Sequence, residues 1–467
     1  MKAERKSEMD EKSSEIIQKY VKILSGSLPC YEAQYKTQNV TLEDIGYLIN
    51  HLDCFVAAFP SNLSKSCIIC KISELIVGFG LVHQVSSDDR DYSSEDFPNT
   101  AINAVECFQY LKHLLKEVHS MEHGFKRHFL INVLLLSATH CKAYHWSSNK
   151  SISSCEEFLA DLLQCTQHHN LASLLCDDNF HPTIFKGALK KMRPSLMKDT
   201  WMLNPSACYI FYWLLCHVKH PQLVDYLTDV FPPPFMFVSY HAVPQKVLGV
   251  QCFNHILDNI PPTLMKLDGN EDAIFHSLFP LTYSKDLPVI EVLYSCLLKL
   301  PMMKTQKAKV VYWGESDKIL NHLLFTVEFE NNRDMKRLYL LHIKDFVECT
   351  PSFKHLKRLI KVVKTLTENP FSDVRCKIIT LQILKTVIQS CWPRMEAHCF
   401  DILISVLDLQ QQNDVQNNDE ISQLSEDCLT LLKFSCREKF MSLTSNYVDD
   451  PNLPGVELLK RIIAKDD

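Results

Sequence analysis

Glycine is unusually scarce in this chain, which has 10 glycines among its 467 residues. Average usage is about 7%, so the chain carries less than a third of the ordinary share. Phosphate-binding loops, barrel loops and hairpin turns all use glycine where the backbone needs a positive φ. The scarcity therefore predicts helices joined by short turns, and it argues against enzymes of the Rossmann or P-loop kind.

Apolar residues recur every three or four positions along most of the sequence, as in amphipathic helices. Two such sets are Val289, Leu293, Cys296 and Leu300, and Val374, Ile378, Leu381, Leu384 and Ile388. Helical segments joined by short connections pair into units of about 40 residues, the length of HEAT and armadillo repeats. The stretch NPFSDVRC also resembles a HEAT unit, with Asp373, Val374 and Arg375 at the entry to its second helix. We therefore expect an all-α fold, an α-solenoid of HEAT/armadillo-like helical hairpins.

Polar, acidic stretches with little to bury divide the chain. The expected organisation is a disordered tail at 1–14, an N-terminal helical-repeat half at 15–230 with an acidic loop near 86–100, and a C-terminal HEAT-like half at 231–467 with a polar loop near 410–420. The proline run in FPPPF, at 231–235, predicts a stiff turn near the junction of the halves.

Charge and hydropathy indicate the cellular compartment and the kinds of partner expected for this chain. The net charge of -6 gives no general attraction to nucleic acid or to acidic membranes. The most apolar run, at 207–218, is too short to span a bilayer, and the first residues lack the apolar core of a signal peptide. The protein is expected in the cytosol or the nucleus, where its nineteen cysteines should stay reduced. No motif implies a cofactor.

Three short motifs imitate chemical sites. Cys252 and His255 lie in KVLGVQCFNHILDNIPP, but two ligands do not make a zinc site. We interpret that stretch as a structural helix whose buried arc includes Gly249, which lets a neighbouring helix approach, and the apolar residues Val250, Phe253, Ile256, Leu257 and Ile260. Cys67 and Cys70 form a CxxC with no second cysteine pair, so a buried helix is expected there too.

His119, Glu122 and His123 spell H-x-x-E-H, the signature of inverted zinc proteases. Gly124 follows directly and is predicted to end the helix, which would place both histidines in its last turn. A zinc hydrolase built on these residues is an alternative that stoichiometric zinc in the purified protein would support.

The clearest surface feature is the stretch KHLKRLIKVVK at 354–364. On a helical wheel one arc holds Lys354, Lys357, Arg358, Lys361 and Lys364, and the other holds Leu356, Leu359, Ile360, Val362 and Val363. This basic stripe is interpreted as a solvated helix face, as a docking site for an acidic partner segment, or as a nucleic-acid contact. It lacks the aromatic residues that stack on bases.

Trp392 and Arg394 form a second candidate contact, because tryptophan and arginine often anchor interfaces. The competing interpretation is a tryptophan packed in the core at a helix end.

Four stretches together resemble the Tel-two-interacting protein two family, the smallest subunit of the TTT co-chaperone complex. They are LKKMRPSLMKDTWMLNP (189–205), QKVLGVQCFNHILDNIPP (245–262), KHLKRLIKVV (354–363) and ILKTVIQSCWPRM (383–395). The resemblance covers the central and C-terminal parts in the same order; the first 100 residues or so contribute nothing to it.

The resemblance implies a non-enzymatic α-solenoid that binds the large TTT scaffold subunit (Tel-two-interacting protein one) and Tel-two. With them it would help the ninety-kilodalton heat-shock chaperone mature phosphatidylinositol-3-kinase-related kinases, including the TOR and DNA-damage kinases. An extended helical stack offers a long surface to other solenoids, so obligate partnership is expected. Another solenoid adaptor, of the nuclear-transport or nucleic-acid-associated kind, would instead use the basic helix at 354–364.

Overall fold

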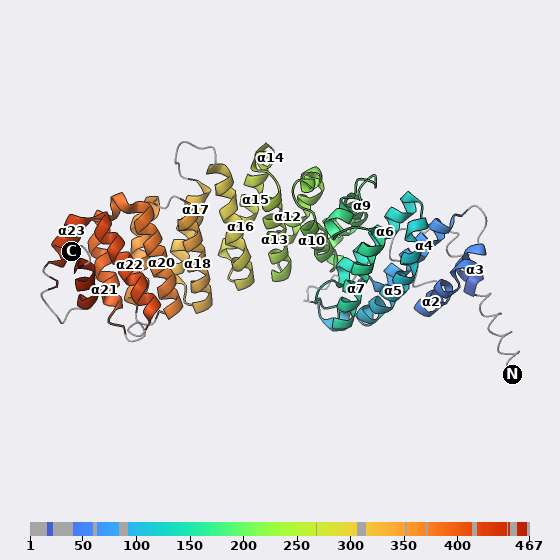
Figure 1. Ribbon diagram of the computed structural model, residues 1–467, viewed down its shortest axis with the longest axis horizontal. Helices are drawn as coiled ribbons and strands as arrows, with labels where there is room; N and C mark the ends of the chain where they lie inside the picture. Colours follow the sequence, from blue (N-terminus) through green and yellow to red (C-terminus); the bar gives the residue numbers. More distant parts are fainter. Residues whose placement is uncertain are drawn as a thin grey trace. The chain divides into compact units, whose positions relative to one another are not determined.

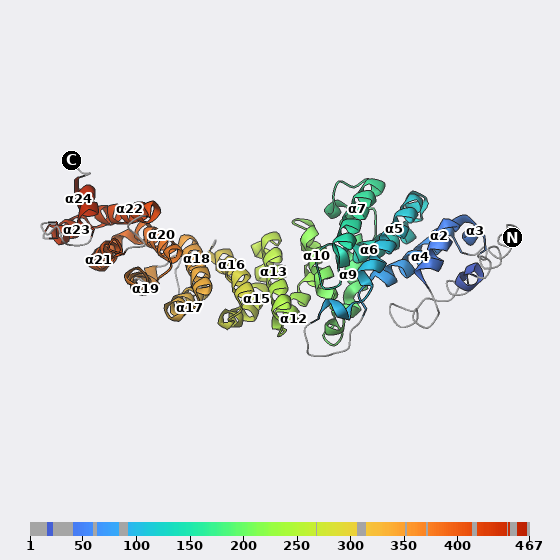
Figure 2. The ribbon, with the colours of Figure 1, turned by 90° about the horizontal axis from the view of Figure 1, so that it is seen from below.

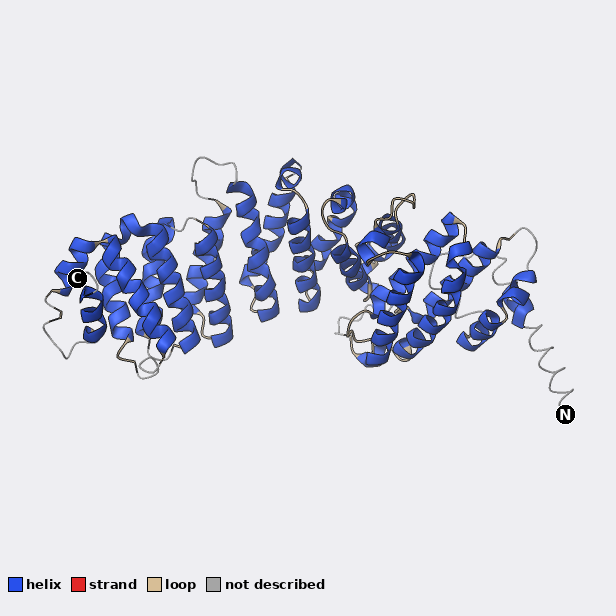
Figure 3. Cartoon of the chain, viewed as in Figure 1, coloured by secondary structure: helices blue, strands red, loops and turns tan. Residues whose placement is uncertain are grey.

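The computed structural model describes residues 16–21, 41–58, 63–83, 92–267, 269–305, 314–350, 353–369, 372–412, 418–445, 447–448 and 455–464. The expected tail at 1–14 lies outside these residues. The described residues form α-helices and short 3-10 helices joined by turns, without a strand (Figures 1 and 3). None of the described helices is both long enough and apolar enough to cross a membrane.

The chain forms two compact units, Met1–Phe237 and Val238–Asp467. The expected division between 230 and 231 stays a prediction. The prolines of FPPPF do not form a separate turn, because they open helix α12 (Pro232–Ser239). Proline is tolerated in a first helical turn, where its missing N–H has no intrahelical acceptor to lose.

The helices of unit 1 are α2 (Leu42–Asn50), α3 (Leu52–Ala57), α4 (Lys65–Gly80), η2 (Ser94–Asp96), α5 (Thr100–Leu114), η3 (Leu115–Ser120), α6 (His123–His140), α7 (Asn149–Thr166), α8 (Leu171–Leu175), α9 (Ile184–Met192), η4 (Arg193–Leu196), η5 (Trp201–Leu203), α10 (Ala207–His217), η6 (Gln222–Tyr226) and α11 (Leu227–Val230). Helix α6 is the centre of this unit, because it packs against α4, α5, α7, α9 and α10. Every residue from Phe129 to His140 is buried.

The helices of unit 2 are α13 (Val243–Asn259), α14 (Pro262–Leu267), α15 (Asn270–Leu278), η7 (Phe279–Tyr283), α16 (Leu287–Thr305), α17 (Glu315–Phe329), α18 (Arg333–Cys349), η8 (Phe353–His355), α19 (Leu356–Glu368), α20 (Val374–Cys391), η9 (Trp392–His398), α21 (Cys399–Leu409), α22 (Asp419–Ser435), α23 (Arg437–Thr444) and α24 (Val456–Ala464).

Unit 2 consists of stacked helical hairpins in two layers. Helices α13, α16, α18, α20 and α22 pack in succession as one layer. Helices α17, α19 and α21 form the other layer, along the opposite side of the unit (Figure 2). This arrangement confirms the predicted all-α solenoid of helical hairpins, and each hairpin buries its apolar face against its neighbours.

The HEAT-like entry at Asp373 ties two hairpins together. Asp373 occupies the N-cap position of α20, but its side chain does not cap that helix. Its carboxylate instead accepts a hydrogen bond of 3.2 Å from Arg337 of α18. The aspartate therefore links successive helices of one layer, and α20 is buried along most of its length.

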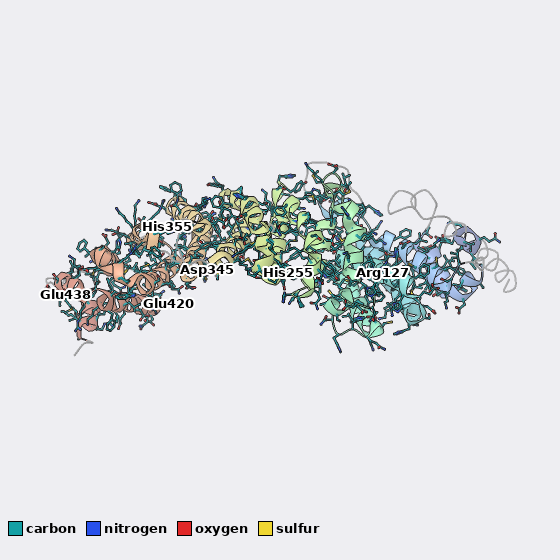
Figure 4. All side chains as sticks on the ribbon, turned by 90° about the horizontal axis from the view of Figure 1, so that it is seen from above. Arg127, His255, Asp345, His355, Glu420 and Glu438 are labelled. Carbon is teal, nitrogen blue, oxygen red and sulfur yellow. The ribbon has the colours of Figure 1, made fainter. Side chains whose placement is uncertain are left out.

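Helix α13 confirms the interpretation of the Cys252 stretch as a structural helix. Its predicted apolar arc is buried, from Val250 to Ile260, and so are Gly249 and Cys252. His255 is only half-buried, and Figure 4 labels it on this helix. The cysteine and the histidine therefore have different surroundings.

Part of the expected acidic loop is packed. Residues 92–100 are described, and Phe97 is buried against Val82 and Trp146. Tyr92 donates a hydrogen bond of 3.0 Å to the carbonyl oxygen of Met202. The expectation of a loop with little to bury overlooked these two aromatic residues, whose burial offsets the polarity of their neighbours.

The polar segment at 410–420 is anchored at both described ends. Gln412 donates a hydrogen bond to the carbonyl oxygen of Thr367, and Asn418 caps the first turn of α22. Residues 413–417 lie outside the described residues.

Candidate partner-docking surface

The helix predicted from the basic stripe forms as two elements. Leu356, Leu359, Ile360, Val362 and Val363 are all buried in α19, so the predicted apolar arc is confirmed. Lys354 departs from the predicted basic arc, because it lies in η8, before α19 begins. Lys357 and Lys361 are exposed, and Arg358 and Lys364 are half-buried.

Most of the stripe is paired with acids of neighbouring hairpins. The Nζ of Lys361 lies 2.7 Å from the Oε1 of Glu328 in α17, and Arg358 lies 3.6 Å from the other oxygen of that carboxylate. Lys364 lies 3.1 Å from Asp401 in α21. These cations therefore neutralise acids within their own layer.

Asp317 collects a third group of these contacts. It accepts hydrogen bonds from the backbone N–H of Gly314 at 2.8 Å, from Lys354 at 3.0 Å and from His355 at 3.1 Å. Burial alone would raise the pKa of Asp317, but these hydrogen bonds outweigh it and hold the pKa below its usual value. Figure 4 labels His355 in this buried network, which joins η8 to α17.

A groove of about 650 Å³ opens beside this network, and we call it the basic groove. Its lining residues are Phe353, Lys354, Leu356, Lys357, Pro393, Arg394, Glu396, Ala397, His398 and Lys439. They come from η8, α19, η9 and α23. Three of the predicted contact residues, Lys354, Lys357 and Arg394, thus lie around one hollow.

The basic groove has an excess of positive charge that the rest of the stripe lacks. Within the described part of the chain, Lys357 and Lys439 form no ion pair. Arg394 is exposed, and its guanidinium lies 5.1 Å from the centre of the Phe353 ring. Glu396 is the one acidic residue in the lining. The groove is therefore suited to an acidic segment.

Trp392 lies directly before this lining and is 60% exposed. The competing interpretation, a tryptophan packed in a helix-end core, is wrong, because most of this side chain is exposed. An exposed tryptophan beside cationic residues is a composition that protein interfaces favour.

Phe353 and Lys439 are among the groove residues that the sequence analysis did not identify. Phe353 precedes the stripe by one position, and Lys439 follows it by a long stretch of sequence. Neither belongs to a motif, and only the stacking of hairpins places Lys439 of α23 beside η9.

The H-x-x-E-H motif does not form a helical metal site. Gly124 was expected to end a helix, but it lies in the first turn of α6, which begins at His123. His119 belongs to η3, and Glu122 is the N-cap residue of α6. The two histidines therefore do not share a helix. His119 contacts Cys165 and His123 contacts Phe180.

Most of the described cysteines are buried thiols. Cys70 lies in α4, and burial raises the pKa of its thiol to about 12. Burial likewise raises the pKa of Cys296 and Cys428 to about 12. Since the thiolate is the reactive form, these cysteines are poor nucleophiles. Among the residues whose positions are described, no group of three or more His, Cys, Asp or Glu side chains could hold a metal ion.

The fold defines the chain as a helical-repeat protein built of stacked hairpins. Comparison with curated proteins identifies proteins of similar sequence. It is 27% identical to TELO2-interacting protein 2 of Rattus norvegicus, over 92% of this chain and 89% of the rat protein. The Mus musculus protein of that name is 30% identical over 61% of this chain and 57% of its own length, and the Homo sapiens protein is 28% identical over 64% and 62%. The chain is thus similar to TELO2-interacting protein 2 over most of its length.

No family model matches the sequence. Similar solved structures include Kap121p bound to Nup53p, with a TM-score of 0.47 and 10% identity over 93% of this chain and 43% of that one. Importin beta matches with a TM-score of 0.41 and 14% identity over 89% and 51% of the two chains. At these values the similarities carry no information about function.

Proposed function

We propose that this chain is a non-enzymatic adaptor subunit of a TTT complex. The observation that carries the proposal is the family match, which extends over 92% of this chain and 89% of the rat relative. That relative is named for an interaction with TELO2. By this proposal the chain binds a TELO2 counterpart and the large TTT scaffold subunit, in the cytosol or the nucleus.

The proposed role of the complex is to support the chaperone-dependent folding and assembly of phosphatidylinositol-3-kinase-related kinases. The kinases and the ninety-kilodalton chaperone would then be indirect partners. Buried thiols of raised pKa and helices joined by short turns favour such a scaffold over catalysis. Stacked hairpins suit the role because they offer a continuous surface to another helical-repeat protein.

The basic groove is the contact that we propose for an acidic segment of one of these partners. Lys357, Arg394 and Lys439 supply the charge, and Trp392 supplies the large apolar anchor. Nucleic acid suits the stripe less well, because Arg358, Lys361 and Lys364 already pair with carboxylates.

Affinity purification of the endogenously tagged protein, without cross-linker and with quantitative mass spectrometry, tests the function. Near-stoichiometric recovery of two other large helical-repeat proteins, with kinases and chaperone in smaller amounts, is expected. Recovery of transport factors or ribonucleoprotein in their place would contradict the proposal.

A charge-reversed variant then tests the groove. Lys357→Glu combined with Arg394→Glu should reduce recovery of one subunit by about tenfold or more, the scale of an interface hot spot. Lys361→Ala is the control, because Lys361 is exposed on the same helix but lies outside the groove lining, and alanine places no like charge beside Glu328. An equal loss in the control would show that the stripe acts through stability and not through docking.

A further inference from the structure

A second groove, of about 930 Å³, lies between η7 and α17. Its lining residues are Phe279, Tyr283, Lys285, Lys318, Asn321, His322, Phe325, Thr326, Phe329, Glu330, Asn331, Asn332 and Met335. We call it the aromatic groove, because Phe279, Tyr283, Phe325 and Phe329 form its apolar part.

The aromatic side chains of this groove are exposed to an unusual degree. Tyr283 is 69% exposed, Phe325 is 55% exposed and Phe329 is 65% exposed. Phe325 and Phe329 stand one helical turn apart on α17, with ring centres separated by 5.1 Å. Contiguous apolar surface of this kind marks an interaction site more often than a solvated face.

The floor of the groove is held in place by His322. Its ring lies 4.7 Å from the Tyr283 ring and 6.2 Å from the Phe279 ring, and it forms a hydrogen bond of 3.2 Å with the hydroxyl of Tyr294. Burial lowers the pKa of His322, so the floor is neutral near pH 7. The groove is thus preformed, which reduces the ordering cost of binding.

The groove lies where the layer of α17, α19 and α21 ends at α17. Helix α19 packs along both of its layer neighbours, α17 and α21. Among the described residues, helix α17 packs less extensively on its other side, where Lys318 contacts the Phe275 ring of α15 and His322 contacts the Tyr283 ring of η7. This side of α17 therefore leaves exposed aromatic side chains against which a further helix can pack.

The rim of the groove carries positive charge. Within the described residues, Lys285 and Lys318 form no ion pair. The guanidinium of Arg358 also lies 5.4 Å from the centre of the Phe325 ring, but it is paired with Glu328 and adds no excess charge. The acid of the lining, Glu330, accepts a hydrogen bond from the backbone N–H of Asn332. The rim is therefore complementary to an occupant with carboxylates.

We propose that the aromatic groove binds an amphipathic helix of a partner protein, with aliphatic side chains against Tyr283, Phe325 and Phe329 and acidic side chains toward Lys285 and Lys318. Such a helix would pack beside α17. Its sequence would carry apolar residues at i, i+3 or i+4, and i+7. The inference rests on the proposed adaptor function, and it specifies the chemistry of a partner segment.

A photo-cross-linking residue in place of Phe329, in the full chain in cells, tests the inference. The control carries the same residue in place of Phe434, which is 74% exposed on α22 in the other layer. Cross-links from position 329 alone should map to a partner segment with the stated apolar spacing and flanking Asp or Glu. Cross-links within this chain, to a second copy, or to segments without that pattern would overturn the inference.

The cross-linked segment, made as a labelled peptide, gives the second measurement. Its Kd for the purified full chain should rise by about tenfold or more with Phe329→Ser or Lys318→Glu, and should be unchanged with Phe434→Ser. Equal binding by all variants would overturn the inference. If no cross-link forms while TTT subunits still copurify, the inference fails and the adaptor function stands. If no subunit copurifies, the adaptor function itself fails.

Discussion

Helices α6 and α19 show two ways in which this chain builds a repeat. Helix α6 of unit 1 is buried at every residue from Phe129 to His140, with neighbours on all sides. Helix α19 of unit 2 buries one face and presents Lys357 and Lys361 to solvent on the other. The first helix is stabilised by packing together with buried hydrogen bonds such as that of His140, and the second by packing together with ion pairs to α17 and α21.

The difference indicates where binding surfaces can form. A helix surrounded by other helices has no side chain left for a partner. A helix in the layer of α17, α19 and α21 exposes a full face. Both grooves are lined by helices of this layer, the basic groove by α19 and the aromatic groove by α17. In this layer, ion pairs between neighbouring helices stabilise the packing of the hairpins. The exposed residues beside these pairs remain available to a partner.

The largest effect should come from removing core volume in α6. Leu134→Ala, at a side chain with no exposed surface, should lower the free energy of unfolding by about 4 kcal/mol, because the surrounding helices cannot collapse into the cavity. Hydrogen exchange with mass spectrometry should show the loss of protection in unit 1. A loss of less than about 1 kcal/mol would mean that α6 is not tightly packed.

Removing Asp317 should be the most damaging change to the charged network of unit 2. Asp317→Ala leaves Lys354 and His355 without their buried carboxylate and should cost about 3 kcal/mol. Asp317→Asn, which keeps an acceptor for the Gly314 N–H, should cost less. Urea unfolding followed by circular dichroism measures both, and equal stability of wild type and Asp317→Ala would contradict the role given to this network.

Each unit contains a buried neutral histidine, so the free energy of unfolding of each unit should fall in mild acid. His140 donates to the carbonyl oxygen of Gly80 and His342 to that of Ile290, and burial lowers the pKa of each from 6.5 to about 4. A lowered folded pKa means that the unfolded chain binds the proton first. The stability is therefore complete above pH 6.5 and declines as the pH falls toward 4.

Each histidine should thereby lower the free energy of unfolding by about 2 kcal/mol as the pH falls from 7 to 5. His342→Gln keeps a hydrogen-bond donor that does not titrate, so it should flatten the pH dependence of exchange in unit 2 only. His140→Gln should do the same in unit 1. An unchanged pH dependence in both variants would show that other groups control the acid response.

The smallest effect should come from an exposed pair of the stripe. Lys361→Ala removes the ion pair with Glu328 and should change the free energy of unfolding by less than about 1 kcal/mol, because solvent screens a lysine that is mostly exposed. Thermal unfolding at low and high salt measures this. A larger loss that salt does not reduce would mean that Lys361 also contributes packing.

The sequence by itself determined the helical class and the buried face of individual helices. Ten glycines and a repeated helical spacing predicted the class, and the arcs of α13 and α19 are buried as the helical wheels indicated. These features are local, because the period of an α-helix fixes which side chains share a face. Helix ends were less predictable, since Glu122 breaks the H-x-x-E-H pattern by starting a new helix.

Only the tertiary structure decided which surface residues are available. The acids that pair with Arg358 and Lys364 lie in other hairpins, in α17 and α21, and nothing in the basic stripe identifies them. For the same reason Lys439 lines the basic groove, and Tyr283 lines the aromatic groove together with Phe325. Stacking of hairpins brings together residues distant in sequence, and the charge and exposure of each side chain depend on those neighbours.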